Sequence, residues 1–559
     1  MGDALIFSKR SIFVFFIFHL LILRVSVAQP LTEIQLYKRC YNHLTQKPVS
    51  LNDSRAIQIK NGQLRATQAC RDLINTSELQ GDGFLKNSNN ENLAILRTLN
   101  SFHKSFFQVN NVEQIPDYSI ELNRGTEDAY DPSEPSMTLT YNLLRNEPFK
   151  NVLNYGTGFR AIRSQDGMKS LISGFGSAPA PFLGTRRFAH SNSENIHVKS
   201  RSVAGTTGQL FAIPFLNFTD ASGQPQVISL STFYPNFFDP GTNYQRPISD
   251  MSQMPLLRSG DVIGIRPTTE SYVVPHLTLQ PSSDFLMTKP GDIEPNLEFQ
   301  FNFFQTFGGG IIGQPVFYLM NYGHNLGVKF NGTTKLPRRW SRSVYESFLC
   351  LSFPNLREND ITSYLNTNSS VGFRTQKSCL QCHGTLDQAA MTARNLVTGS
   401  LDDLDIIAGD NQFTRFPMVV TKYRSIQNNG DFWPSEPDPQ FHLQNPQGRI
   451  LYRAHNGQLV NQPVSSIADF AQKLSETDDF YSCAAKRYFE YFTGKSVPLY
   501  DRSDPRNAEM NRKLNESQIR DRKTVEQLGK NLKQHQSLKR MIAEIIETDI
   551  YRDENYDPK

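Results

Sequence analysis

The feature that most restricts what this chain can become is one short segment, Cys379-Leu380-Gln381-Cys382-His383. In this pattern both thiols can add to the vinyl groups of a haem, while the adjacent imidazole reaches the iron. We therefore expect Cys379 and Cys382 to attach one covalent haem c, with His383 as an axial iron ligand. The pattern occurs once in 559 residues, so the sequence predicts a single haem rather than a multihaem chain.

Two other chemistries also use a Cys-x-x-Cys pair. A zinc site needs further ligands, and the chain has no second Cys-x-x-Cys pair and no His-x-x-x-His pair. A thioredoxin-like dithiol usually opens a helix after a strand, but residues 373–378 form only a weak strand candidate. Zinc binding, dithiol chemistry and coincidence remain the alternatives to haem.

The sixth iron ligand is less constrained by sequence, because a distal Met or His can lie tens of residues away. Met391 follows His383 too closely, on what we expect to be the same helical element. Met418 is the favoured ligand because Pro417 would keep the chain out of helix and orient the thioether. A core methionine is the simpler alternative. Other possibilities are Met320, His324, His442 and an open site.

The first 28 residues have the layout of a secretory signal peptide. Lys9 and Arg10 precede an apolar run at residues 11–23, and Ser26-Val27-Ala28 offers small residues for cleavage near Ala28. An uncleaved anchor is the alternative, although the run is shorter than the ~20 residues that span a bilayer. No later segment is long and apolar enough to span. We expect a periplasmic protein with no transmembrane segment once the signal is removed.

Four cysteines remain outside the haem motif, and an exported chain matures where thiols are usually paired. Four cysteines allow three pairings. We favour Cys40–Cys70 and Cys350–Cys483, because each pair would then close one region of the chain. Buried free thiols are the alternative.

The length and texture of the chain predict several units, since single cores rarely grow beyond ~250–300 residues. We expect a mainly α protein with an irregular, loop-rich α+β middle segment and a C-terminal all-α, cytochrome c-like haem domain. With 58 Lys+Arg and 54 Asp+Glu the charges nearly balance, so no nucleic-acid partner is expected. The expected units are a signal peptide (1–28), a helical domain (29–110), a loop- and strand-rich domain (111–300), the haem domain (301–505) and a helical extension packed on it (506–559).

Hydrophobic spacing supports this division. Apolar residues recur at the helical period within residues 31–110, and again at 480–492 and 524–550. Residues 260–267 read as a turn followed by a strand. The basic cluster at 335–342 either enters a helix in solvent or contacts a haem propionate or an acidic partner.

The C-terminal half resembles the haem-containing region of planctomycete-type cytochrome c proteins, which are bacterial proteins built of several domains of unknown function. The similarity covers roughly residues 300–555, and Leu36–Thr45 resembles the family's N-terminal helical piece. It implies a covalent haem c at Cys379, Cys382 and His383 and an extracytoplasmic setting, and it strengthens the pairing of Cys350 with Cys483. The matching segments, in the family's order, are Ile311–Leu319, Phe348–Cys350, Ser378–His383, Gly457–Pro463, Ser482–Gly494 and Ser537–Asp549.

These observations favour a monohaem c-type cytochrome that transfers electrons in the periplasm or cell envelope, with a redox protein as its partner. One alternative is a cell-envelope binding or structural protein that haem stabilises. Another is a haem oxidoreductase with an open distal site. An electron carrier is favoured over an enzyme, because the chain has no GxSxG, HExxH or Walker motif.

Overall fold

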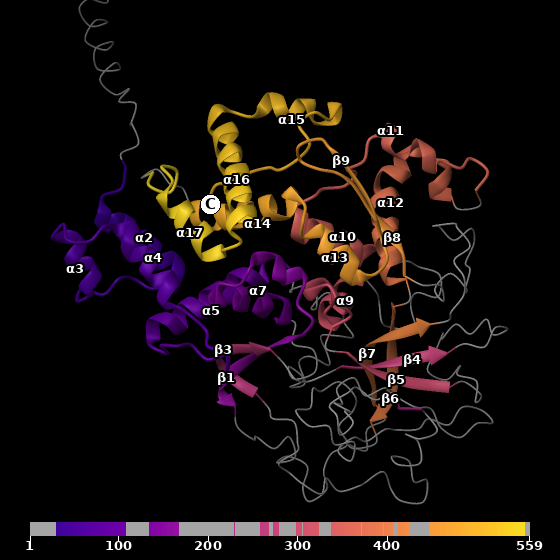
Figure 1. Ribbon diagram of the computed structural model, residues 1–559, viewed down its shortest axis with the longest axis horizontal. Coiled ribbons are helices and arrows are strands. Elements are labelled where there is room, and N and C mark those ends of the chain that lie inside the picture. The colour runs from indigo at the N-terminus through magenta and orange to yellow at the C-terminus, as the bar shows by residue number, and fades with distance from the viewer. Residues whose placement is uncertain are drawn as a thin grey trace, which may run out of the picture.

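The computed structural model of the protein is mainly helical and includes three small sheets (Figure 1). The expected signal peptide, residues 1–28, lies outside the described part of the chain. The structure describes residues 30–107, 133–166, 228–229, 258–267, 272–278, 298–304, 306–322, 337–369, 372–394, 396–405, 412–423 and 446–553.

Four helices form the N-terminal region, as the periodicity predicts. They are α2 (Glu33–Thr45), α3 (Ser54–Lys60), α4 (Ala66–Thr76) and α5 (Asn90–Lys104). Thr32 caps α2 with a capping box that it shares with Gln35, so two amide groups of the first turn are satisfied. Asp53 and Asn89 cap α3 and α5 through their side-chain oxygens.

Helix α7 (Glu134–Arg145) lies inside the segment that we expected to consist of loops and strands. All its residues from Glu134 to Leu144 are buried. A helix that is buried on every side has no polar face, so the periodic pattern that reveals surface helices is weak here. The short 3-10 helix η2 (Phe149–Leu153) follows it.

The predicted strand near residue 260 is present as β3 (Arg258–Pro267), which pairs antiparallel with β1 (Phe159–Asp166). A five-stranded sheet has the order β2-β5-β4-β7-β6. In that sheet β7 runs parallel to β4, which joins the middle of the chain to the C-terminal region. Its strands are β2 (Ile228–Ser229), β4 (Tyr272–Thr278), β5 (Glu298–Phe304), β6 (Leu396–Asp405) and β7 (Gln412–Tyr423).

The expectation that residues 301–505 are all-α is wrong, because β6 and β7 lie there together with a hairpin of β8 (Gly448–Arg453) and β9 (Leu459–Val464). Two residues explain why the segment from β8 to β9 is not helical. Gly457 adopts a φ of 84° between β8 and β9, which helical residues do not. Pro463 in β9 cannot lie inside a helix.

The remaining helices come from the C-terminal half. Helix α14 ends at Gly494, which has a φ of 69°, as its position predicts. The helical pattern at 524–550 is two helices rather than one, because Gln536 turns the chain with a φ of 58°. The helices are α9 (Pro315–Tyr322), α10 (Arg338–Leu349), α11 (Glu358–Ile361), α12 (Lys377–Ala390), α13 (Ile467–Leu474), α14 (Asp478–Thr493), α15 (Ala508–Lys513), α16 (Glu516–His535) and α17 (Leu538–Glu547).

One hydrophobic core joins the two ends of the described chain, from Leu36 to Tyr551. Helix α17 packs against α4, and α16 packs against α14 (Figure 1). The amide of Leu31 donates to the carbonyl of Arg552 at 2.8 Å, and Arg39 donates to the carbonyl of Tyr551 at 2.7 Å. The N-terminal helices and the C-terminal extension are therefore packed as one body.

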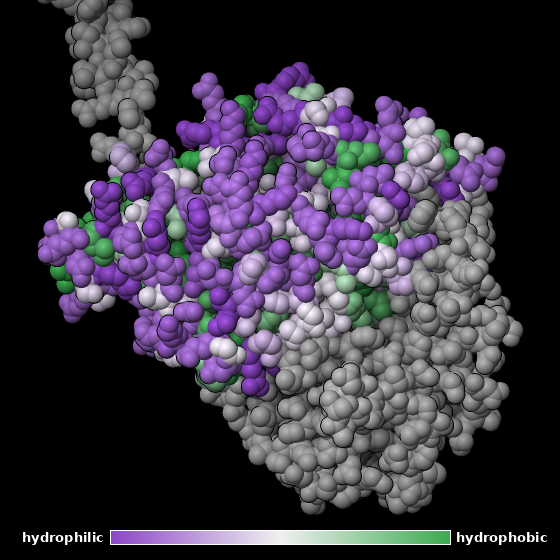
Figure 2. Space-filling view, viewed as in Figure 1, coloured by the Kyte–Doolittle hydropathy of each residue, from purple (hydrophilic) through white to green (hydrophobic). Residues whose placement is uncertain are grey.

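The surface over the described residues is mostly hydrophilic on the face that Figure 2 shows, and apolar residues there are scattered. Among the described helices, none combines the length and the apolar character needed to cross a membrane.

Candidate functional site

Helix α12 carries Cys379, Cys382 and His383, the three residues predicted to hold haem, in its first two turns. Because Cys379, Cys382 and His383 are three and four residues apart, they lie on neighbouring positions of one helix face. Residues 372–375 before the helix form the 3-10 helix η7 (Gly372–Thr375) and not a strand. The weak strand candidate at 373–378 is therefore wrong, and the strand-then-helix layout of a thioredoxin-like dithiol is not found at this position.

The cysteines fall into two groups. Cys379 and Cys382 are free and half-buried. Cys40 is bonded to Cys70, with their Cα atoms 6.2 Å apart, and Cys350 is bonded to Cys483, with a Cα distance of 5.2 Å. Both favoured disulfide pairings are thus present in the structure. The first bridge connects α2 with α4, and the second connects the end of α10 with α14.

The His383 ring is held by a carboxylate one helical turn further on. Its Nδ1 lies 3.2 Å from both side-chain oxygens of Asp387, which is completely buried. The Phe373 ring stacks on the imidazole, with 4.2 Å between the ring centroids. We assign the Nδ1 proton to the bond with Asp387, because a carboxylate accepts hydrogen bonds. This assignment leaves the Nε2 lone pair available in the plane of the ring.

Arg338 of α10 holds the same carboxylate from the other side. Its Nε donates to Asp387 Oδ1 at 2.5 Å, and its Nη2 donates to Oδ2 at 3.0 Å. Burial alone would raise the pKa of Asp387, but the hydrogen bond from His383 and the charge of Arg338 outweigh burial and lower it. Asp387 therefore carries a negative charge when it meets His383.

These residues fit a haem c. The motif supplies two thiols outside the disulfides and an imidazole whose orientation is set by one carboxylate, that of Asp387, as is usual for histidines that bind metals. Phe373 covers a face of the His383 ring, but a metal binds along the lone pair in the ring plane, so the stack leaves Nε2 free. Burial raises the pKa of Cys382, while Arg342 and Arg506 act against this rise.

Among the predicted distal ligands, the structure describes the side chains of Met320 and Met391 only. Met418 lies in β7, paired with Gly399, so the chain there is indeed out of helix, but its side chain lies outside the described residues. Met320 on α9 is buried in the core. Met391 follows α12 directly and is fully buried. His324 and His442 lie outside the described residues.

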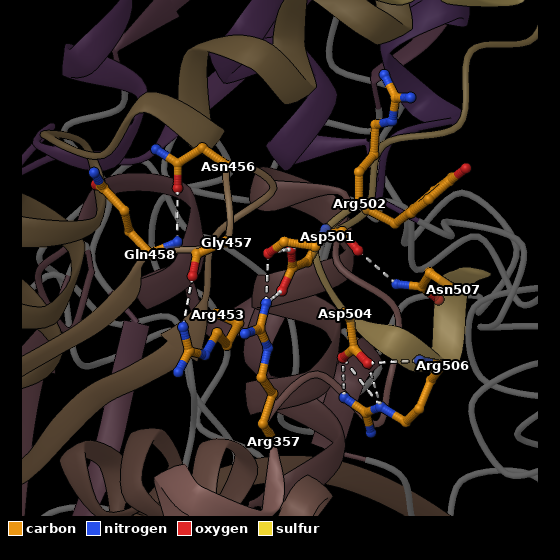
Figure 3. A network of polar contacts seen from close by, with 12 residues as sticks. Arg357, Arg453, Asn456, Gly457, Gln458, Asp501, Arg502, Asp504, Arg506 and Asn507 are labelled. Carbon is orange, nitrogen blue, oxygen red and sulfur yellow. Dashed lines mark hydrogen bonds and ion pairs between the residues drawn. The ribbon is translucent and has the colours of Figure 1, made fainter. Parts of the chain in front are cut away.

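Sequence reasoning missed a cavity of about 780 Å³ between α10, α14 and the segment after residue 498. Ion pairs line one side of it, and Figure 3 shows Asp504 beside Arg506 and Asp501 beside Arg357. The hydrogen bond from Arg506 lowers the pKa of Asp504. The residues of this cavity come from segments more than a hundred positions apart, so no local pattern marks it.

Within the described ranges, no group of three or more His, Cys, Asp or Glu side chains is arranged to hold a metal ion. No protein-family model matches the chain. Neither a curated protein nor a solved structure shows detectable similarity to it.

Proposed function

We propose that this protein is a monohaem c-type cytochrome that transfers electrons in the periplasm or cell envelope. The observation that carries the proposal is the arrangement around His383, which the motif alone does not require. A buried, negatively charged Asp387 orients the imidazole, and Arg338 orients Asp387 in turn. A histidine that is only a surface residue needs no such support.

Each residue has a defined task in this proposal. Bound haem supplies one-electron chemistry at its iron. Cys379 and Cys382 hold the group covalently, so it stays bound in either oxidation state. Asp387 keeps the proton of His383 on Nδ1 and directs Nε2 towards the metal, and its charge makes the imidazole a stronger donor. Arg338 prevents the buried Asp387 from turning away or becoming protonated.

The proposed compartment rests on separate features. The predicted signal peptide and the two disulfides agree with a protein that matures outside the cytoplasm. A c-type cytochrome in that compartment exchanges electrons with another redox protein, which we propose as its partner.

Covalent attachment provides the direct test. The chain, expressed with a cytochrome c maturation system, should keep its haem after denaturation and acid-acetone extraction. Cys382→Ala should reduce the number of thioether bonds from two to one or abolish attachment, which mass spectrometry and the reduced optical spectrum both report. Ser378→Ala, an exposed neighbour on α12, is the control and should attach haem normally. Haem that is extracted from the parent protein, or attachment unchanged in Cys382→Ala, contradicts the proposal.

The Asp387 contact also favours a second function, a haem oxidoreductase with an open distal position. A more strongly donating proximal histidine helps an iron that activates oxygen species, by the same electronic push that a thiolate ligand supplies. Prompt binding of carbon monoxide by the reduced protein would support this function. A low-spin spectrum that carbon monoxide does not perturb would support the electron carrier.

A further inference from the structure

The cavity between α10, α14 and the segment after residue 498 has charged walls that are already held in place. Each of its charged lining residues except one belongs to an ion pair, and Figure 3 shows two of these pairs. Walls that are fixed in this way can receive a ligand without being ordered first. The pairs are Arg342–Glu346, Arg357–Asp501, Arg453–Asp360, Lys486–Glu490 and Arg506–Asp504.

Arg487 of α14 is the exception. It lines the cavity, and among the described residues no carboxylate lies within ion-pair distance of it. Its Nη2 donates to the carbonyl of Glu346 at 3.1 Å, and its Cζ lies 4.8 Å from the centre of the Phe106 ring, but its Nε is buried without a partner. Burial lowers the pKa of Arg487 to about 10. Because the other charges cancel in pairs, the lining carries one positive charge that lacks a counterion.

Two further side chains of the lining have polar atoms without a partner. His455 is 7% exposed, and its Nε2 donates to the carbonyl of Leu349 at 2.8 Å, so in the neutral ring Nδ1 is an acceptor. This Nδ1 has no partner among the described residues. Asn355 is 9% exposed; one end of its amide lies 3.0 Å from the Thr385 hydroxyl, and the other end lacks a described partner. Buried polar groups are normally hydrogen-bonded, so three such groups around one cavity indicate that a ligand supplies the missing bonds.

The chemistry of the lining defines the class of ligand. A carboxylate pairs with a guanidinium, and a hydroxyl group can donate to the Nδ1 of His455. A phosphate ester carries close to two negative charges, which is more than the single unpaired charge of Arg487. The volume of about 780 Å³ lies within the ~300–1,000 Å³ that is common for ligand pockets. The apolar part of the walls comprises Leu351, Phe353, Pro354, Leu499 and Met510.

We propose that this cavity binds a small organic monocarboxylate that has an apolar body and a hydroxyl group. Arg487 pairs with the carboxylate, and His455 accepts a hydrogen bond from the hydroxyl group. The binding site is separate from the haem motif, because neither the cysteines nor the histidine of that motif line the cavity. The inference therefore does not depend on electron transfer by the protein.

Three probes that differ by one group each test the class of ligand in isothermal titration calorimetry with the full chain. They are 3-phenyllactate, 3-phenylpropanoate, which lacks the hydroxyl group, and 3-phenyllactamide, which lacks the charge. We expect 3-phenyllactate to bind most tightly. Removal of the charge should weaken binding about tenfold or more, because a charged hydrogen-bonded contact is lost. Removal of the hydroxyl group should weaken it several-fold.

An arginine variant tests the location of the site. Arg487→Gln should bind 3-phenyllactate about tenfold more weakly than the parent and should lose the preference for the acid over the amide. Arg512→Gln is the matched control, because Arg512 is an exposed cation on α15 that does not line the cavity. The control should bind all three probes as the parent does.

A second pair of variants keeps the test valid if Arg487→Gln does not fold. Met510 on α15 lines the cavity and is 46% exposed, so the fold should accept a polar residue there. Met510→Glu adds a negative charge to the cavity, whereas Met510→Gln has the same shape without the charge. Binding of 3-phenyllactate should be several-fold weaker in Met510→Glu than in Met510→Gln, and binding of 3-phenyllactamide should be equal in both.

Three results would overturn the inference. One is a parent protein that does not bind 3-phenyllactate at millimolar concentration. Another is equal affinity of the parent for the acid and the amide, which would remove the role of the carboxylate. The third is binding that neither Arg487→Gln nor Met510→Glu weakens, which would place the ligand elsewhere on the protein. The extraction test for covalent haem is independent of all three results.

Discussion

Replacing Asp387 by Asn separates the electronic role of this residue from its role in stability. The amide keeps the size of the side chain but removes the negative charge that Arg338 and His383 share. The imidazole should then be a weaker donor to iron, which destabilises the ferric state more than the ferrous state. We expect the midpoint potential to rise.

Both the change in midpoint potential and the change in stability can be estimated. If the loss of the Asp387 charge changes the ratio of ferric to ferrous protein about tenfold, the midpoint potential rises by on the order of 50 mV, because a tenfold change in a one-electron equilibrium corresponds to about 59 mV. Breaking a fully buried ion pair costs about 3–5 kcal/mol. The Arg338 side chain is 33% exposed, so water compensates part of its lost partner, and we expect unfolding to become easier by about 2–3 kcal/mol.

Spectroelectrochemical titration and urea unfolding of the same preparations measure the two quantities. Glu91→Gln is the control, because it also removes a carboxylate that accepts from an arginine, Arg55, but on α5 and far from the haem motif. The control should lose some stability at an unchanged potential. If Asp387→Asn loses stability while its potential stays at that of the parent, the argument that Asp387 acts on the iron through His383 is refuted.

Two further predictions concern the body of the protein. Replacing Cys350 and Cys483 by Ala opens a loop with a sequence separation of 133, so loss of this bridge should cost about 5 kcal/mol in urea unfolding. The Cys40–Cys70 bridge has a sequence separation of 30, and its loss should cost about 4 kcal/mol. Equal stability of either variant and the parent would contradict this. Burial lowers the pKa of His103 from 6.5 to about 3. Between these pH values the unfolded chain binds one proton more than the folded protein. The folded protein therefore loses stability as the pH falls, by an amount on the order of 5 kcal/mol. His103→Gln should flatten this pH dependence, and an unchanged slope in unfolding measurements between pH 6.5 and 3 would show that the dependence arises elsewhere.

The sequence predicted those elements whose signals are local. Periodic apolar positions mark α2, α5 and α14, and these helices lie where they were expected. Strand β7 was missed although its neighbour β6 lies close before it in the chain, where Gly399 pairs with Met418. Strand β6 contains a glycine and three aspartates, which are residues that strands disfavour, so the strand pattern there is weak and the segment around Met418 was assigned to an all-α domain.

The candidate site also consists of residues that a local sequence pattern marks and of residues that only long-range packing brings together. Cys379, Cys382 and His383 form one contiguous motif, and the prediction of haem came from this motif alone. Asp387 could have been found, since residues four apart on a helix are neighbours. Arg338 was noticed only as a member of a basic cluster that either enters a helix in solvent or contacts a propionate or an acidic partner, whereas the structure pairs it with Asp387. The cavity depends on long-range packing that no motif encodes.

The contact between the two ends of the described chain has a consequence for how the protein acquires its structure. Leu31 and Arg39 bond to the backbone at residues 551 and 552, and α4 packs on α17. A chain that emerges with its N-terminus first cannot complete this core until its last helix has followed. The early helices form before their partners exist, so closure of this core is a late, long-range step of folding.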